Sequence, residues 1–111
     1  MASIRQSKLE SLLKRDLSDI FQVETRGLGI KEMVTVTVVR VSPDMSFAKV
    51  YVSIFPSDNA QAVLVTLKEQ QSYFRGLLGK KIGRQVRMVP EIAFYLDDSL
   101  DYADRIDQLL K

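Results

Sequence analysis

Five basic side chains gather in one stretch of the chain, and the chemistry open to them is the binding of negatively charged groups. They are Arg75, Lys80, Lys81, Arg84 and Arg87. No acidic residue stands between them, and the net charge of the whole chain is only +2. Lysine and arginine in an exposed segment neutralise the phosphates of nucleic acids. The stretch is therefore a candidate anion-binding site.

Catalytic chemistry has few residues available to it. The chain contains no histidine and no cysteine, which excludes a histidine-based triad, a cysteine nucleophile and a typical zinc site. Asp97 and Asp98, with Asp101 or Asp104, form the only acidic cluster dense enough for magnesium or acid/base work. Runs of charge are more often solvated, and these acids also suit a helix start. We expect no catalytic residue, no bound metal and no cofactor.

The composition is typical of one globular domain, which we place at residues 1–111. Hydrophobic residues make up 46% and charged residues 27% of the 111 positions, and no apolar run approaches the roughly 20 residues of a membrane span. The first residues lack the apolar core of a secretory signal. The absence of cysteine allows a reducing compartment, and the cytoplasm is the expected location.

The elements that position the basic stretch begin with an amphipathic helix from residue 3 to about residue 22, with Ser3 as its N-cap. Its outer face carries Arg5 and Lys8, which either are solvated or contact nucleic acid. Thr25 to Gly29 breaks the pattern. Residues 31–41 are rich in β-branched side chains and predict a strand.

A turn at residues 42–45, with proline in second place, predicts a hairpin. The returning strand buries Ala48, Val50, Val52 and Ile54 on one face. Tyr51 and Phe55 lie on the other face, where they either stack on bases or, as we favour, cover a sheet edge or pack under a helix.

The second half of the chain predicts a helix, a break, a strand and a final helix. An apolar stripe from Ala60 to Leu78 is interrupted by polar residues at 70–72, which indicates two helices meeting at a kink. Gly79 and Gly83 are expected to take positive φ angles where the helix ends. A strand follows that includes residues 86–96, with Pro90 at an edge or bulge. The last helix is expected from Ser99.

The order helix, strand, strand, helix, helix, strand predicts an α+β fold whose crossover brings the third strand parallel to the second. Three segments of the chain are distinctive: residues 41–53, Phe74-Arg75 with Leu78-Gly79, and residues 87–94 leading to Asp98-Ser99-Leu100. Together they resemble the ribosome-binding factor A family. The resemblance runs from the first helix to the last and covers almost the whole chain.

This resemblance implies a KH-like domain of the second topological type (helix-strand-strand-helix-kink-helix-strand) with a C-terminal helix. It also implies a bacterial cytoplasmic factor that contacts small-subunit ribosomal RNA during late maturation and supports rRNA processing. The family has an Ala-x-Gly kink between its second and third helices. The matching positions here are Gln70, Gln71 and Ser72, or residues nearer Phe74 in an ungapped alignment, and neither alanine nor glycine is present at 70–72. The sequence Gly76 to Gly79 reads Gly-x-x-Gly, but its leucines belong to the apolar stripe.

We therefore expect a monomer, with no membrane association, that binds the small ribosomal subunit and its rRNA without catalysing a reaction. The predicted RNA-binding residues are Arg5, Lys8, Arg75, Lys80, Lys81, Arg84 and Arg87. A protein-interaction module that uses a sheet edge, without direct RNA binding, is the alternative, because the net charge is small.

Overall fold

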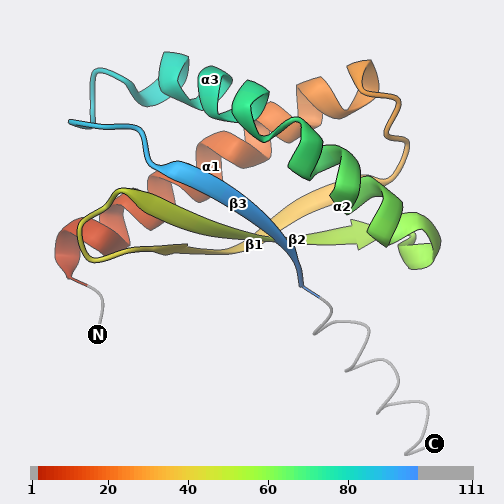
Figure 1. The fold of residues 1–111 in the computed structure, drawn as a ribbon, viewed down its shortest axis with the longest axis horizontal. Coiled ribbons are helices and arrows are strands. Elements are labelled where there is room, and N and C mark those ends of the chain that lie inside the picture. The colour runs from red at the N-terminus through yellow and green to blue at the C-terminus, as the bar shows by residue number, and fades with distance from the viewer. Residues whose placement is uncertain (1–2, 98–111) are drawn as a thin grey trace, which may run out of the picture.

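A computed structural model describes residues 3–97, which form a three-stranded sheet with helices on one face (Figure 1). The elements in chain order are α1 (Ile4–Gly27), β1 (Met33–Val41), β2 (Phe47–Phe55), the short 3₁₀ helix η1 (Ser57–Asn59), α2 (Ala60–Glu69), α3 (Gln71–Ile82) and β3 (Glu91–Leu96). This order confirms the predicted KH-like arrangement. The predicted helix from Ser99 lies outside the described residues.

The sheet has the order β1-β2-β3. β1 pairs antiparallel with β2, and β3 pairs parallel with β2, as the crossover predicted. Alternation along β2 buries Ala48, Val50, Val52 and Ile54 under the helices. The opposite face of β2 carries Tyr51, whose ring stacks on Tyr95 of β3 with 5.5 Å between centroids.

Three aromatic rings from distant parts of the chain join the helices to the sheet. Phe21 of α1 lies 5.1 Å from Phe74 of α3 and 5.8 Å from Phe94 of β3, measured between ring centroids. Phe74 and Phe94 are also 5.8 Å apart, nearly perpendicular. All three side chains are buried. The Phe21–Phe74 and Phe74–Phe94 pairs are edge-to-face, and such contacts add about 0.5–1.5 kcal/mol per pair beyond the area they bury.

α1 continues to Gly27, so the prediction that it ends near residue 22 is wrong. The Thr25 hydroxyl donates to the carbonyl of Phe21 at 2.7 Å, which allows this polar residue to be buried inside the helix. The chain turns at Gly29, which has a φ of 75°. The Ile30 N–H donates to Thr25 and the Gly29 N–H to Arg26, the pair of bonds that defines a Schellman motif.

β3 begins at Glu91, so Val86 and Met88 lie in a loop rather than in the strand as predicted. Pro90 directly precedes the strand, where its missing N–H removes no ladder hydrogen bond. Gly79 and Gly83 do not take the positive φ angles that we expected; Gly83 has a φ of −56°. A Cβ on Gly83 would stand 2.6 Å from the carbonyl oxygen of Gly79, so close packing explains this glycine.

Of the predicted acidic cluster, only Asp97 lies within the described residues. Its carboxylate accepts a hydrogen bond of 2.6 Å from the hydroxyl of Thr37, which lies at the register shift in β1. Within residues 3–97, no group of acidic residues is arranged to hold a metal ion, and no helix is long and apolar enough to cross a membrane.

Candidate nucleic-acid interface

The start of α1 is held against the end of β1 by side chains of its first two turns. Ser3 and Gln6 form a capping box, in which each side chain accepts a hydrogen bond from the other residue's backbone N–H. Gln6 also donates to the carbonyl of Val41 at 3.0 Å, and Glu10 accepts from the Val41 N–H at 2.8 Å. These contacts fix the helix turn that carries Arg5 and the turn that follows it.

The β1–β2 hairpin faces this helix start. The Met45 N–H donates to the carbonyl of Ser42 at 2.8 Å, which closes the turn containing Pro43. Met45 itself has a φ of 60°, a left-handed conformation that few residues other than glycine adopt. The carboxylate of Asp44 accepts hydrogen bonds from the hydroxyls of Ser42 and Ser46. These bonds, that of Ser42 first, hold the pKa of Asp44 below its ordinary value of 3.8.

The third component is the junction loop, by which we mean residues 83–90 between α3 and β3. Arg75 in α3 holds its far end, because the guanidinium donates to the carbonyls of Pro90 at 3.1 Å and Val89 at 2.8 Å. The first residue of β3, Glu91, donates its N–H to the carbonyl of Ser46 in the hairpin. The junction loop is therefore attached at one end to both α3 and the hairpin.

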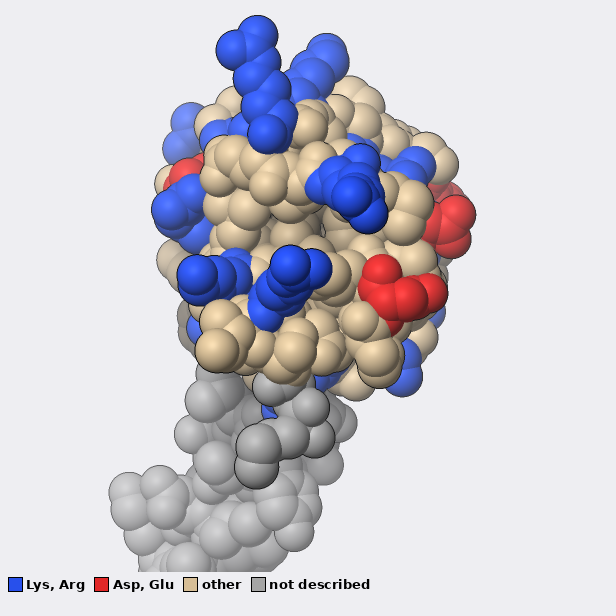
Figure 2. Space-filling model, turned by 90° about the vertical axis from the view of Figure 1, so that its left-hand side faces the viewer, with Lys and Arg blue, Asp and Glu red and all other residues tan. Residues whose placement is uncertain are grey.

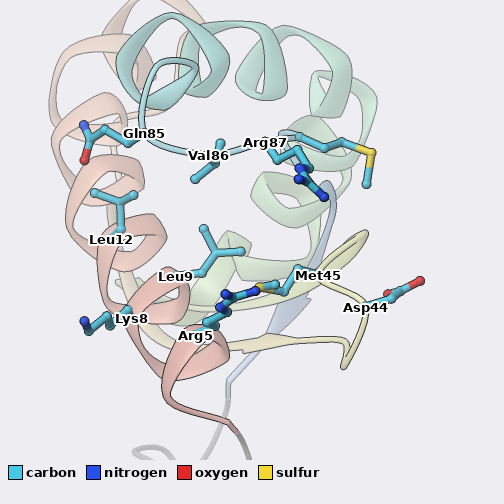
Figure 3. A pocket seen from close by; sticks show the side chains of 10 residues that line it. Arg5, Lys8, Leu9, Leu12, Asp44, Met45, Gln85, Val86 and Arg87 are labelled. Carbon is cyan, nitrogen blue, oxygen red and sulfur yellow. The ribbon is translucent and has the colours of Figure 1, made fainter.

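These three components surround a hollow of about 530 Å³ (Figure 3). Its lining residues are Arg5, Lys8, Leu9, Leu12, Asp44, Met45, Gln85, Val86, Arg87 and Met88. Leu9 and Val86 point into the hollow from opposite sides, whereas the carboxylate of Asp44 points away from it (Figure 3). We call this space the apical hollow.

The apical hollow brings together three predicted RNA-binding residues from both ends of the sequence: Arg5, Lys8 and Arg87. Figure 2 views this end of the molecule and shows Lys and Arg side chains around a hollowed surface, with acidic side chains toward its edge. Within residues 3–97, the only ion pair joins Arg15 to Asp16 at 3.3 Å. The cations around the apical hollow are thus available to an anionic partner.

Lys80, Lys81 and Arg84 are also exposed, but they stand outside the lining of the apical hollow. Lys80 and Lys81 occupy the last turn of α3, and Arg84 follows the C-cap residue Gly83. Cations in this position also interact favourably with the partial negative charge of a helix C-terminus, typically by about 0.3–1 kcal/mol. A test that removes them must therefore monitor the stability of α3.

Arg75 differs from the other predicted binding residues because two of its guanidinium nitrogens are occupied by loop carbonyls. Its main observed contact is with the protein backbone. It is therefore a positioning residue for the junction loop, which carries Arg87.

The kink is present, and it falls at Gln70, between α2 and α3, rather than nearer Phe74. Gln70 has φ and ψ angles of −98° and 17°, which residues with side chains adopt at turns, so the bend needs no glycine. Gln71 and Ser72 are the first residues of α3, and Gly76 to Gly79 lies inside it.

The kink lies far from the apical hollow. Gln70 and Tyr73 border a shallow depression with Glu24 and Gly27, at the C-terminal end of α1. The Tyr73 hydroxyl donates to Glu24 at 2.8 Å, and this hydrogen bond raises the pKa of Tyr73. The helix rise of about 1.5 Å per residue separates Lys8 from Gly27 by roughly 28 Å. The predicted kink and the predicted cations around the hollow therefore belong to different ends of the molecule.

Sequence reasoning missed the apolar part of this site. Leu9, Leu12 and Val86 were assigned to apolar stripes, and Met45 only to a turn. The helical spacing of Leu9 and Leu12 could not show that part of this face borders a hollow, since that depends on where the hairpin and junction loop pack. The left-handed conformation of Met45 has no signal in its residue type.

The aromatic residues on the open face of the sheet are not covered by helices of the described part. Phe55 is 73% exposed, and Tyr51 is half-buried beside Tyr95. We favoured aromatics that cover a sheet edge or pack under a helix, and within residues 3–97 the second of these two possibilities is wrong for both residues. The reason is that all the described helices lie on the other face of the sheet (Figure 1).

Comparisons with known proteins agree on one family. The sequence model described as Ribosome-binding factor A matches residues 5–110. Ribosome-binding factor A of Cytophaga hutchinsonii is 44% identical over 110 residues, covering 99% of this chain and 83% of the relative. The protein of the same name from Chlorobaculum tepidum is also 44% identical, covering 98% of this chain and 90% of the relative.

Solved structures agree with the sequence relatives. The crystal structure of ribosome-binding factor A from Thermus thermophilus superposes with a TM-score of 0.67 at 27% identity, covering 82% of this chain and 94% of that one. A homology model of Thermus thermophilus ribosome-binding factor A, fitted into a cryo-EM map of a complex of 30S with this factor, gives a TM-score of 0.64 at 26% identity, with 82% of this chain and 93% of that one covered.

Proposed function

Because this chain belongs to the ribosome-binding factor A family, we propose that it is an assembly factor that binds the small ribosomal subunit late in its maturation. The observation that carries the proposal is the match of nearly the whole chain to relatives of that name, one of which was fitted into a complex with the 30S subunit. This function implies a location in the bacterial cytoplasm and a role supporting rRNA processing.

We infer that the chain acts by binding rather than by catalysis. Arg5, Lys8 and Arg87 around the apical hollow, with Lys80, Lys81 and Arg84 beside it, would neutralise phosphates of the rRNA. Contacts to phosphates fix the position of a protein without reading the sequence, so the shape of the rRNA would select the site. The exposure of these cations, and their lack of ion pairs within the described residues, support this assignment.

A triple substitution tests the assignment. We expect Lys80→Gln, Lys81→Gln and Arg84→Gln together to reduce co-sedimentation with small subunits by at least about tenfold, because each lost phosphate contact weakens binding. The matched control replaces Arg26, Lys31 and Lys68 with glutamine. These substitutions remove the same charge elsewhere: Arg26 lies in the last turn of α1, Lys31 between α1 and β1, and Lys68 in the last turn of α2.

Circular dichroism of both variants establishes whether α3 remains folded. Equal binding of the folded triple variant and the unmodified protein would contradict the assignment of these residues. Equal loss in the control variant would show that total charge, rather than its location, controls binding. A protein-interaction module without RNA contact is the alternative, and it predicts that neither variant loses affinity for small subunits.

A further inference from the structure

The apical hollow combines an apolar interior with a basic rim. Leu9 and Val86 point into the interior, the thioether of Met45 approaches from the hairpin, and Leu12 lines the side next to Lys8 and Gln85 (Figure 3). Its volume of about 530 Å³ falls in the range of about 300–1,000 Å³ that small-ligand sites occupy. Phosphate neutralisation gives no reason for this apolar lining, since phosphates are hydrated and bind charged or polar groups.

The rim restricts the chemistry of the ligand. Arg87 lies above the hollow on the junction loop and Arg5 below it at the start of α1, whereas Lys8 and Gln85 extend toward the outer side of α1 (Figure 3). There, a second and more open depression of about 720 Å³ shares Lys8, Leu12 and Gln85 with the apical hollow and adds Arg15 and serines of α1. Cations therefore continue from one depression to the next, as the backbone of a nucleic acid would require.

We propose that the apical hollow holds one unstacked base of single-stranded RNA, with Arg5 and Arg87 on the phosphates that flank it. The base lies against Leu9, Leu12, Val86 and Met45, and the strand continues past Lys8. The proposal rests on the function proposed above and adds the part of the RNA that the site recognises. A wholly apolar ligand would leave the three cations unpaired, and a base paired in a duplex could not reach the interior.

Met45 provides a selective way to change the hollow. Its backbone is left-handed, a conformation that glycine adopts without strain. Met45→Gly should therefore retain the hairpin turn while removing one apolar wall and no charge. Met33→Gly is the matched control, because Met33 is an exposed methionine at the start of β1, away from the hollow.

The probes are an octamer of riboadenosine and an octamer of ribose phosphate without bases, which carry equal charge. We expect the unmodified protein to bind the adenosine octamer about five- to tenfold more tightly than the abasic octamer, from the contribution of one base contact. Met45→Gly should remove most of this difference and leave binding of the abasic octamer unchanged. Met33→Gly should preserve the difference.

Methyl resonances report the location directly. Leu9, Leu12, Met45 and Val86 should shift when the adenosine octamer is added, and shift much less with the abasic octamer. Equal affinity for the two octamers, or no methyl shift at these residues, would overturn the base site. Co-sedimentation with small subunits is measured in parallel. If the base site fails but the unmodified protein co-sediments with small subunits, only the base site is rejected. If the unmodified protein does not co-sediment with small subunits, the proposed function itself is rejected.

Discussion

Arg75 and Arg87 belong to the same basic segment, yet their side chains have different surroundings. Arg87 borders the apical hollow, whereas Arg75 donates to the carbonyls of Val89 and Pro90. Proximity in sequence could not separate these two roles. The difference becomes visible only when the junction loop is seen to fold back over α3.

A conservative substitution distinguishes the two arginines by stability. Arg75→Lys keeps the charge but cannot span two carbonyls as a planar guanidinium does. We expect its free energy of unfolding in urea to fall by about 1 kcal/mol, which is typical of lost hydrogen bonds at a partly exposed site.

Arg84→Lys is the matched control, since within residues 3–97 no hydrogen bond involves the Arg84 side chain, and its stability should not change. Equal stability of the two variants would show that the carbonyl contacts of Arg75 contribute nothing measurable.

At the scale of elements, the break between α2 and α3 is a local weak point. The Gln70 N–H donates to the carbonyl of Thr66, and the Phe74 N–H donates to the carbonyl of Gln70. Gln71, Ser72 and Tyr73 begin a new helix, whose first N–H groups have no partner within that helix. Gln70 supplies no side-chain cap.

We expect the amides of Gln71, Ser72 and Tyr73 to exchange on the order of tenfold or more faster than those of Leu67 and Leu78. Hydrogen exchange followed by NMR measures these rates residue by residue. Uniform protection from Val63 to Leu78 would mean that the two helices are continuous in solution. The buried side chains of Leu67 and Leu78 provide the internal reference on either side.

The sequence was sufficient for the elements whose periodicity was uninterrupted. The spacing of Leu9, Leu13 and Leu17 placed α1, and alternation from Ala48 to Ile54 placed β2 with the correct face buried. The errors occurred where a local pattern competed with a tertiary contact. Val86 and Met88 continue the alternation of β3 by coincidence, because residues 83–90 instead pack between α3 and the hairpin.

The site was predictable only in part. The cations are visible in the sequence, but Arg5 and Arg87 line one hollow only because the hairpin and the start of α1 pack together. Gln6 and Glu10 accomplish this through the backbone of Val41. Neither side chain carries a sequence signal for that contact, since both also suit an exposed helix face.

At the scale of the whole molecule, charge location matters more than net charge. The net charge is only +2, but the cations of the apical hollow and the end of α3 are gathered at one end. If about three to five of them neutralise phosphates, log affinity for the small subunit should fall against log salt with a slope of about −2 to −4, at about 0.7–0.9 per phosphate.

Titrations of fluorescently labelled protein with small subunits at several salt concentrations measure this slope. In the Lys80→Gln, Lys81→Gln, Arg84→Gln variant the slope should be less negative by a difference of roughly two, whereas Met45→Gly should leave the slope unchanged. A slope near zero for the unmodified protein would favour a protein-interaction module.

The three packed rings of Phe21, Phe74 and Phe94 affect the order in which the protein can fold during synthesis. Phe21 and Phe74 are made before Phe94, and β3 pairs with β2 only after the whole α2–α3 crossover has been produced. A nascent chain that stops before β3 lacks one of the three rings and one edge of the sheet. The ribosome must therefore translate past Leu96 before the core of this protein can close.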